Sequence, residues 1–379
     1  MTPARESGGP PPLSVLMTAD TLGGVWTYAL ELARALSERD VTIGLAAIGR
    51  LPEEAQMEEA LSVPGLELFC SDYRCEWMDD CWEDQQRSGL WLRELRHELR
   101  PDVLHLNAYG HAAEPFDLPV LITAHSCVLS WWEAVYRTRP PARLERYRLH
   151  VQRGLRGADV VVAPTRHMLD CLRRHYGDLP RTAVVPNGRS ARRFHPAPKQ
   201  GFVLACGRYW DEAKNLAALE WAAPRIPWPV EVIGPLRSPD GGSPPVRWVR
   251  HLGPRPWQAV AQRLGRAAIC AHPARYEPFG LVPLEAALSR CCLVLGDTPS
   301  LRELWEDAAL YVPPDEPAAL ADALGLLIGS PKLREELAAA AYARALRMTP
   351  AAMADAYLRV YHDLRRDLRA RRPASRAEA

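Results

Sequence analysis

Short apolar segments alternate with helix-like segments along this chain, and the pattern starts twice. The first start is residues 13–18, an apolar run that leads through Gly23 and Gly24 into residues 25–37, where apolar side chains recur at helical spacing. The second start is residues 202–206. Strands that alternate with helices form a parallel sheet covered on both faces. We therefore predict an α/β protein with two domains, each built on a parallel sheet.

The other expected elements fit the same scheme. Further strands are expected at residues 41–47, 103–106, 120–123, 160–162 and 183–185, and then at residues 230–233, 268–271 and 292–295. Further helices are expected at residues 90–99, 215–223, 281–288 and 317–327, and in two parts between residues 331 and 368. The length of 379 residues also favours two domains, because a single core usually stops growing at about 250–300 residues.

The composition along the chain indicates where the domains begin and end. We predict a first domain at residues 13–190 and a second at residues 201–348. Residues 191–200, rich in Arg and Pro, are expected to form an exposed linker between them. The polar segments 1–12 and 369–379 are expected to be disordered.

Composition also excludes several kinds of protein. The net charge of +1 gives no reason to expect nucleic acid as a partner. Residues 1–12 lack the apolar centre of a signal peptide, and no apolar run reaches the roughly 18 residues of a membrane span. Nine cysteines without a CxxC pair suit a reducing compartment. We expect a cytoplasmic protein with no transmembrane segment, at most peripheral on the inner membrane face.

The most specific local motif is residues 276–285, Tyr-Glu-Pro-Phe-Gly-Leu-Val-Pro-Leu-Glu. It places Glu277 and Glu285 on either side of Gly280, where a helix is expected to begin. The free N–H groups at a helix start attract phosphate or a developing anion, and glycine permits close approach. Either glutamate alone fits an ordinary acidic residue near the positive end of a helix equally well.

A basic motif follows the strand predicted at residues 202–206. Arg208 offers a planar fork of donors and Lys214 a mobile point charge, so the two together can neutralise a diphosphate. Ligands of α/β proteins bind beyond the carboxyl ends of the strands, which is where this motif is expected. Taken singly, either cation also suits a solvated surface turn.

These motifs, in this order, resemble glycosyltransferase family 4. The resemblance covers nearly the whole chain and rests on residues 23–24, 102–105, 123–125, 163–165, 185–188, 207–208, 277–285 and 357–361. It implies the GT-B fold, in which two Rossmann-like α/β/α domains with parallel sheets face each other across a cleft. The first would be the acceptor side and the second the nucleotide-sugar side, and a C-terminal helix, residues 349–368, would cross back to the first domain.

The resemblance also implies the roles of individual side chains. Arg208 and Lys214 would grip the donor diphosphate and stabilise the charge that develops on it, without a metal or other cofactor. Glu277 would contact hydroxyls of the transferred sugar, His125 would lie near that sugar, and Glu285 would accept hydrogen bonds from the ribose. The remaining donor-site residues implied are Gly23, Gly24, Gly234, Leu252, Phe279, Gly280, Leu281 and Val282. One departure is Asn215, which stands where the family commonly has glycine after the lysine.

The resemblance leaves the substrates open. A UDP- or GDP-sugar carrying glucose or mannose is expected as donor, and a glycan, a lipid-linked compound or a small molecule as acceptor, in a pathway such as polysaccharide biosynthesis. Aromatic and acidic residues at 72–91 and 130–132 suit either a sugar platform or packing under a loop. Basic segments at 90–100 and 137–156 suit either peripheral contact with an anionic membrane or solvated helix faces. His105 and His111 lack the partners of a zinc site.

Two further functions share this architecture. A GT-B nucleotide-sugar epimerase normally lacks the two glutamates combined with Arg and Lys. A non-catalytic sugar-nucleotide-binding partner protein would be expected to have lost Arg208, Lys214 or Glu277, and none is lost. A retaining transfer is therefore the favoured activity, and binding of donor without turnover would indicate the partner protein.

Overall fold

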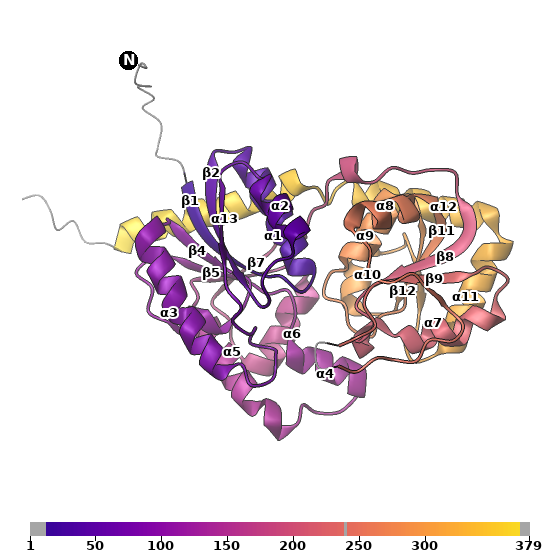
Figure 1. Cartoon of the computed structure of the whole chain (residues 1–379), viewed down its shortest axis with the longest axis horizontal. Helices are drawn as coiled ribbons and strands as arrows, with labels where there is room; N and C mark the ends of the chain where they lie inside the picture. Colours follow the sequence, from indigo (N-terminus) through magenta and orange to yellow (C-terminus); the bar gives the residue numbers. More distant parts are fainter. Residues whose placement is uncertain (1–12, 239–240, 372–379) are drawn as a thin grey trace, which may run out of the picture. The chain divides into compact units, whose positions relative to one another are not determined.

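The computed structural model describes residues 13–238 and 241–371, and strands and helices alternate through both halves (Figure 1). The first-half strands are β1 (Leu13–Asp20), β2 (Val41–Ile48), β3 (Leu66–Cys70), β4 (Val103–Leu106), β5 (Val120–Thr123), β6 (Val160–Ala163) and β7 (Arg181–Val184). The first-half helices are α1 (Gly24–Ser37), α2 (Glu54–Leu61), α3 (Trp82–Leu99), α4 (Val128–Tyr136), α5 (Glu145–Gly157) and α6 (Arg166–Tyr176), with 3-10 turns η1 (Gly110–Ala113) and η2 (Ala142–Leu144).

The second half repeats the alternation. Its strands are β8 (Gln200–Cys206), β9 (Val230–Ile233), β10 (Arg250–His251), β11 (Ala267–His272), β12 (Cys292–Gly296) and β13 (Leu310–Val312). Its helices are α7 (Leu216–Ala222), α8 (Trp257–Arg266), α9 (Leu281–Leu288), α10 (Pro299–Trp305), α11 (Pro317–Gly329), α12 (Pro331–Ala345) and α13 (Pro350–Arg371), with 3-10 turns η3 (Ala191–Arg193), η4 (Glu212–Lys214) and η5 (Ala223–Arg225). None of the described helices is long and apolar enough to cross a membrane.

Two sheets confirm the predicted α/β architecture. The first has seven strands in the order β3-β2-β1-β4-β5-β6-β7, and the second has six in the order β10-β9-β8-β11-β12-β13. Strand β1 pairs in parallel with β2 and β4, and β8 pairs in parallel with β9 and β11. Strand order therefore reverses at β1 and at β8. Ligands of open α/β sheets bind beyond the carboxyl ends of the strands at such a reversal.

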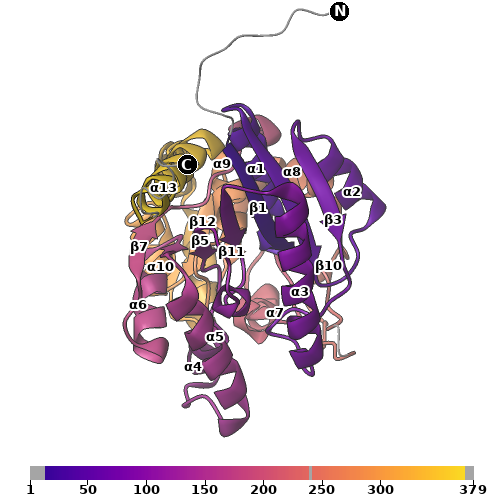
Figure 2. The same ribbon diagram turned by 90° about the vertical axis from the view of Figure 1, so that its left-hand side faces the viewer.

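Residue contacts divide the chain into two compact units. Within the described residues, unit 1 comprises residues 13–123, 153–160 and 357–371, and unit 2 comprises residues 124–152, 161–238 and 241–356. Strands β1 to β5 belong to unit 1, where α1, α2 and α3 pack beside β1, β2 and β3 (Figure 2). The whole six-stranded sheet belongs to unit 2. The domain boundaries expected from the sequence, 13–190 and 201–348, remain a prediction.

Alternating residues of the six-stranded sheet fill two separate cores, as the strand period of two requires. Leu204 and Cys270 face one core, which is closed by α8, α9 and α10. Val203 and Ile269 face the other, which is closed by α7 and α11. Both faces of the sheet are thus covered by helices. A ligand-binding site on this sheet is therefore expected at its edges or at the ends of its strands.

Helix α3 begins at Trp82, well before the predicted start at residue 90. Its early turns bury Gln85, Ser88 and Gly89 rather than apolar side chains. Apolar periodicity is the signal that predicts a helix, so a buried face of polar and small residues escapes it. Two of these polar side chains have nearby partners: the Ser88 hydroxyl donates to the Asp84 carbonyl and the Gln85 amide N–H donates to the Arg74 carbonyl, each at 2.7 Å.

Two predictions about irregular segments need correction. The disordered tail predicted from residue 369 is helical to Arg371, because α13 continues that far. Within the predicted linker, Phe194 is buried in the core of the six-stranded sheet. In the same segment, the Lys199 ammonium donates to the carbonyls of Leu264, Gly265 and Ser289. Residues 1–12 and 372–379 lie outside the described residues.

Candidate active site

The carboxyl ends of β8 and β9 approach each other so closely that only glycine fits between them. Gly234 follows β9 with φ of +136°, and a Cβ there would lie 1.9 Å from the carbonyl oxygen of Gly207. The Gly207 N–H donates to the Ile233 carbonyl at 3.0 Å. Gly234 is therefore fixed by packing of backbone on backbone. The loops that carry the predicted donor-binding residues begin at this point.

Lys214 and Glu277, expected to act on different parts of the donor, form an ion pair. Lys214 Nζ lies 2.7 Å from Glu277 Oε2, and the two side chains are only 17% and 12% exposed. His272, the last residue of β11, places Nε2 2.9 Å from the same carboxylate oxygen. Burial by itself raises the pKa of Glu277, but the Lys214 ammonium and the His272 hydrogen bond outweigh it and hold that pKa well below its usual range. The carboxylate is therefore an ionised acceptor at neutral pH.

Lys214 is positioned by the short turn η4 and by the residue that follows it. Asp211 caps the turn, because its Oδ1 accepts the Ala213 N–H at 3.0 Å. Asn215 has a left-handed backbone with φ of 58°, and its buried amide donates to the carbonyls of Pro273 and Pro314. Asparagine tolerates this conformation better than other residues with a side chain. This explains how it replaces glycine here while also tying the lysine turn to the loop after β11.

The glutamate loop closes onto the start of α9. Gly280 has φ of +87° at the N-cap of that helix, and a Cβ there would lie 3.0 Å from Pro283 Cγ and 3.3 Å from Glu277 Cγ. No side chain caps this helix. Phe279 is buried, whereas Leu281 and Val282 keep part of their surface exposed. Residues 279–282 thus form a tight turn beside the Lys214–Glu277 pair, and their contact with the sugar stays a prediction.

Glu285 also has a partner that the sequence did not predict. Arg189 Nη2 lies 2.9 Å from Glu285 Oε1, and the side chains are 3% and 14% exposed. Arg189 comes directly after the predicted strand at 183–185 and its Pro-Asn-Gly continuation. Arg208, predicted to act with Lys214, directly follows Gly207 and holds its guanidinium 5.2 Å from the centre of the Trp210 ring.

His125 lies two positions after Thr123, the last residue of β5. Burial lowers the pKa of its imidazole to about 3, so the ring is neutral at physiological pH. Two residues on, the Cys127 N–H donates to Tyr276 Oη at 2.9 Å, and Tyr276 precedes Glu277. This hydrogen bond joins the His125 segment to the glutamate loop within unit 2, and the place of His125 near the sugar stays a prediction.

Gly234 and Leu252, which the resemblance places in the donor site, both have backbone hydrogen bonds near β9. The Leu252 N–H donates to the Val232 carbonyl at 2.9 Å, and His251 Nε2 lies 2.8 Å from the Gly234 carbonyl. Gly23 and Gly24 belong to unit 1, where Gly23 is the N-cap of α1 directly beyond the carboxyl end of β1. Their predicted approach to the diphosphate stays a prediction.

Comparison with known proteins identifies the family. Residues 22–193 match the model of Glycosyltransferase Family 4, and residues 247–344 match that of Glycosyl transferases group 1. The chain is a glycosyltransferase of the family 4 type. It is 27% identical to a D-inositol 3-phosphate glycosyltransferase of Xylanimonas cellulosilytica over 91% of this chain and 94% of that one. It is 30% identical to a phosphatidyl-myo-inositol mannosyltransferase of Mycobacterium leprae over 47% of this chain and 52% of that one.

Solved structures show that this glycosyltransferase has the GT-B fold. A sucrose-phosphate synthase from Thermosynechococcus elongatus matches with a TM-score of 0.77 at 18% identity, over 93% of this chain and 99% of that one. HepE from Anabaena, solved in complex with UDP-glucose, matches with a TM-score of 0.74 at 17% identity, over 93% and 100% of the two chains. The resemblance in fold and family read from the sequence is confirmed.

The acidic stretch at 72–91 contributes to packing in the glycosyltransferase. The buried carboxylate of Glu76 accepts the N–H groups of Tyr109 and Gly110, at 2.9–3.2 Å. Ser88 Oγ lies 2.8 Å from His111 Nε2, so this histidine is held by a hydroxyl. Within the described residues, no group of three or more His, Cys, Asp or Glu side chains could hold a metal ion.

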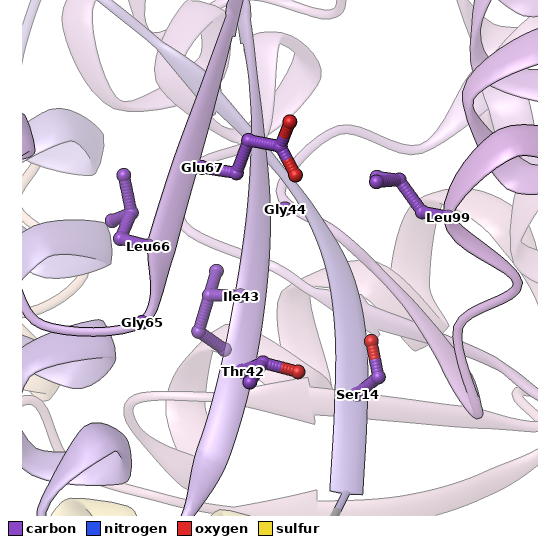
Figure 3. A pocket seen from close by; sticks show the side chains of 8 residues that line it. All are labelled: Ser14, Thr42, Ile43, Gly44, Gly65, Leu66, Glu67 and Leu99. Carbon is purple, nitrogen blue, oxygen red and sulfur yellow. The ribbon is translucent and has the colours of Figure 1, made fainter. Parts of the chain in front are cut away.

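A pocket in unit 1 has none of the predicted site residues in its lining (Figure 3). Its eight lining residues are Ser14, Thr42, Ile43, Gly44, Gly65, Leu66, Glu67 and Leu99. The strand residues among them pair near the amino ends of β1, β2 and β3, as in Ser14 with Thr42 and Ile43 with Leu66. Because ligands of such sheets bind at the opposite, carboxyl edge, this pocket is not the candidate active site.

Proposed function

We propose that this glycosyltransferase moves a hexosyl group, glucose or mannose, from a nucleotide diphosphate sugar to a glycan, lipid-linked or small-molecule acceptor, with retention of anomeric configuration. The observation that carries the proposal is the ion pair of Lys214 with Glu277 at 2.7 Å, beside the turn at Gly280. It combines a cation for phosphate, an ionised carboxylate for sugar hydroxyls and an uncapped helix start.

Cleavage of the bond between the anomeric carbon and the phosphate oxygen leaves negative charge on the diphosphate. Lys214 and Arg208 stabilise that charge, and such electrostatic stabilisation is usually the largest contribution to a rate. Glu277 orients the sugar through its hydroxyls, and Glu285 accepts hydrogen bonds from the ribose. A leaving phosphate oxygen takes the acceptor proton while the acceptor attacks the same face, which preserves the configuration. The two cations supply this charge stabilisation without a resident metal.

The relatives support the substrate classes. HepE was solved with UDP-glucose, and the curated relatives are named for an inositol phosphate and for a phosphatidyl-inositol. A UDP- or GDP-sugar is therefore the proposed donor, and a phosphorylated or lipid-linked polyol is the first acceptor to try, bound by the N-terminal domain. We place the proposed enzyme in the cytoplasm. When its acceptor is lipid-linked, the enzyme would be peripheral on the inner membrane face.

The test is a panel of UDP, GDP and ADP sugars assayed for thermal stabilisation and for nucleotide release with D-inositol 3-phosphate and phosphatidyl-inositol vesicles as acceptors. One donor is expected to stabilise the protein by about 2.7 kcal/mol at a hundredfold excess over Kd. Lys214→Ala and Glu285→Ala should abolish the shift, and the product should keep the donor's anomeric configuration by NMR.

Other results would contradict the proposal. Stabilisation by a donor without turnover on any acceptor would indicate a non-catalytic partner protein. Conversion of the donor into an isomeric sugar would indicate an epimerase. No stabilisation by any donor would refute the nucleotide-sugar site itself.

A further inference from the structure

Arg189 is a buried arginine whose guanidinium contacts the carboxylate expected to bind ribose. Its side chain is 3% exposed, so it does not reach a ligand itself, whereas Glu285 keeps 14% of its side chain exposed. A buried carboxylate needs a cation or several donors, and Arg189 supplies a cation that remains charged at every physiological pH. Oε1 of the Glu285 carboxylate is thus paired with a protein side chain.

The backbone holds Arg189 in this place. Its N–H donates to the Met348 carbonyl at 3.1 Å. A Cβ on the preceding residue, Gly188, would lie 2.3 Å from the carbonyl carbon and oxygen of Thr349, so the two chain segments touch. The guanidinium also lies 5.4 Å from the centre of the Phe194 ring. The arginine is therefore fixed from its backbone to its head group before any ligand arrives.

We propose that Arg189 is a positioning residue for ribose recognition: it fixes the Glu285 carboxylate through Oε1, so that the carboxylate presents acceptor positions to the ribose hydroxyls. This inference rests on the proposed function, because it assumes a nucleotide donor. A hydrogen bond to a charged group contributes about 1.5–3 kcal/mol, which corresponds to roughly 10- to 100-fold in affinity. Removal of Arg189 should therefore weaken discrimination of ribose from deoxyribose.

Unit 2 contains a matched control. Arg263 Nη2 lies 2.6 Å from Oε1 of Glu231, a carboxylate on β9 whose side chain is 2% exposed. Its guanidinium lies 4.1 Å from the centre of the Phe202 ring, as that of Arg189 lies near Phe194. Both arginines thus pair with a glutamate and lie against a phenylalanine ring. Only Arg189 does so at a residue implicated in donor binding.

The experiment measures Kd by calorimetry for UDP and GDP and for their 2′-deoxy forms. The unmodified protein is expected to prefer the ribose form of its own nucleotide by about 10-fold or more. Arg189→Met should reduce that preference to about twofold or less, and Arg189→Lys should restore part of it. Arg263→Met should leave the preference unchanged although it lowers the melting temperature.

A thermodynamic cycle with Glu285→Gln keeps the inference testable if Arg189→Met does not fold. In that case the cycle uses Arg189→Lys. If Arg189 acts through Glu285, its substitution should have no further effect on ribose preference once Glu285 is replaced. Additive effects, or a full preference in a folded Arg189→Met protein, would overturn the inference.

Two results with the unmodified protein would separate the inference from the proposed function. Binding of UDP or GDP without any preference for ribose would overturn the role of Arg189 and Glu285 alone. Absence of binding to both nucleotides would refute the proposed function, and the inference with it.

Discussion

The two units each contain a cluster of buried polar side chains, and the clusters differ in chemistry. In unit 1, the tyrosine–histidine cluster consists of Tyr28, His105, Thr123, Tyr357 and Tyr361, all buried. His105 Nδ1 lies 2.7 Å from Tyr361 Oη, and Nε2 lies 2.7 Å from Thr123 Oγ1. In unit 2, the charged cluster consists of Lys214, His272 and Glu277 and keeps part of its surface exposed.

The difference separates groups that stabilise a unit from groups that can act on a ligand. Burial raises the pKa of Tyr357 to about 12, so its hydroxyl stays protonated, and it lies 2.9 Å from Thr123 Oγ1. Hydrogen bonds of Tyr361 with His105 and of Tyr357 with Thr123 therefore hold helix α13 to β4 and β5 without a ligand. The Lys214–Glu277 pair is partly exposed, and sugar hydroxyls or phosphate oxygens can add to it or replace one partner. Mutation of each cluster should therefore change a different measured quantity.

The largest effect is expected for Lys214→Ala. Loss of the cation removes stabilisation of the leaving diphosphate, so kcat should fall about 10²- to 10³-fold, as when one donor to a developing anion is lost. The measurement is nucleotide release at saturating donor. Lys199→Ala is the matched control, because the Lys199 ammonium is also held by protein groups, which are three backbone carbonyls and Cys291 in unit 2. It should lower stability and leave kcat near that of the unmodified protein. Equal kcat for Lys214→Ala and the unmodified protein would remove the charged cluster from catalysis.

The next effect is expected for Tyr361→Phe in the tyrosine–histidine cluster. The variant leaves a buried nitrogen of His105 without its hydroxyl partner, which costs about 1–3 kcal/mol in the free energy of unfolding. Urea unfolding measures this loss, and Kd for the donor should not change. Tyr342→Phe serves as control, because its ring packs against the Arg290 guanidinium and keeps that contact as phenylalanine. A fall in kcat with unchanged stability would erase the distinction between the clusters.

A pH-dependent effect of intermediate size is expected for His125, whose imidazole belongs to neither cluster. Its folded pKa of about 3 lies below the ordinary value of 6.5, so the unfolded chain binds more protons between these values. This contribution to stability is fully present above about pH 6.5 and is lost as pH falls toward 3, with a slope of at most about 1.4 kcal/mol per pH unit. His125→Gln should flatten the decline in urea unfolding as pH falls from about 6.5 toward about 3. An unchanged decline would mean that other groups cause it.

Residues next to one another in the sequence were predictable, and partners far apart were not. The strands and helices that bury apolar side chains were predicted because apolar periodicity reports them, as at β8 and α9. The acidic and basic motifs were also visible, because Glu277, Glu285, Arg208 and Lys214 lie at characteristic spacings. His272 was missed although it directly follows the strand predicted at 268–271, five positions before Glu277, and a polar residue at a buried strand end was the available signal.

Arg189 illustrates what a single sequence does not contain. It lies 96 positions from Glu285 (285 minus 189), just before the segment 191–200 that composition marks as a linker. Its burial depends on the meeting of residues 188–189 with residues 348–349 and on Phe194, and no local pattern reports such contacts. Pairing of a charged residue follows from tertiary packing, so only the structure could assign it.

The smallest effect is expected for Trp131→Phe, which tests whether the aromatic residues at 130–132 pack or bind sugar. The Trp131 indole N–H donates to Asp211 Oδ1 at 2.8 Å, and the same oxygen caps the turn that carries Lys214. Loss of this hydrogen bond costs about 0.5–1.5 kcal/mol and should lower kcat by roughly 2- to 10-fold, with little change in acceptor KM. Steady-state kinetics with varied acceptor separates the two quantities. Trp132→Phe is the control, because its indole donates to Thr138 instead and should leave kcat unchanged. A rise in acceptor KM in either variant, at constant kcat, would instead favour a sugar platform, and the charged cluster would then extend into an acceptor site.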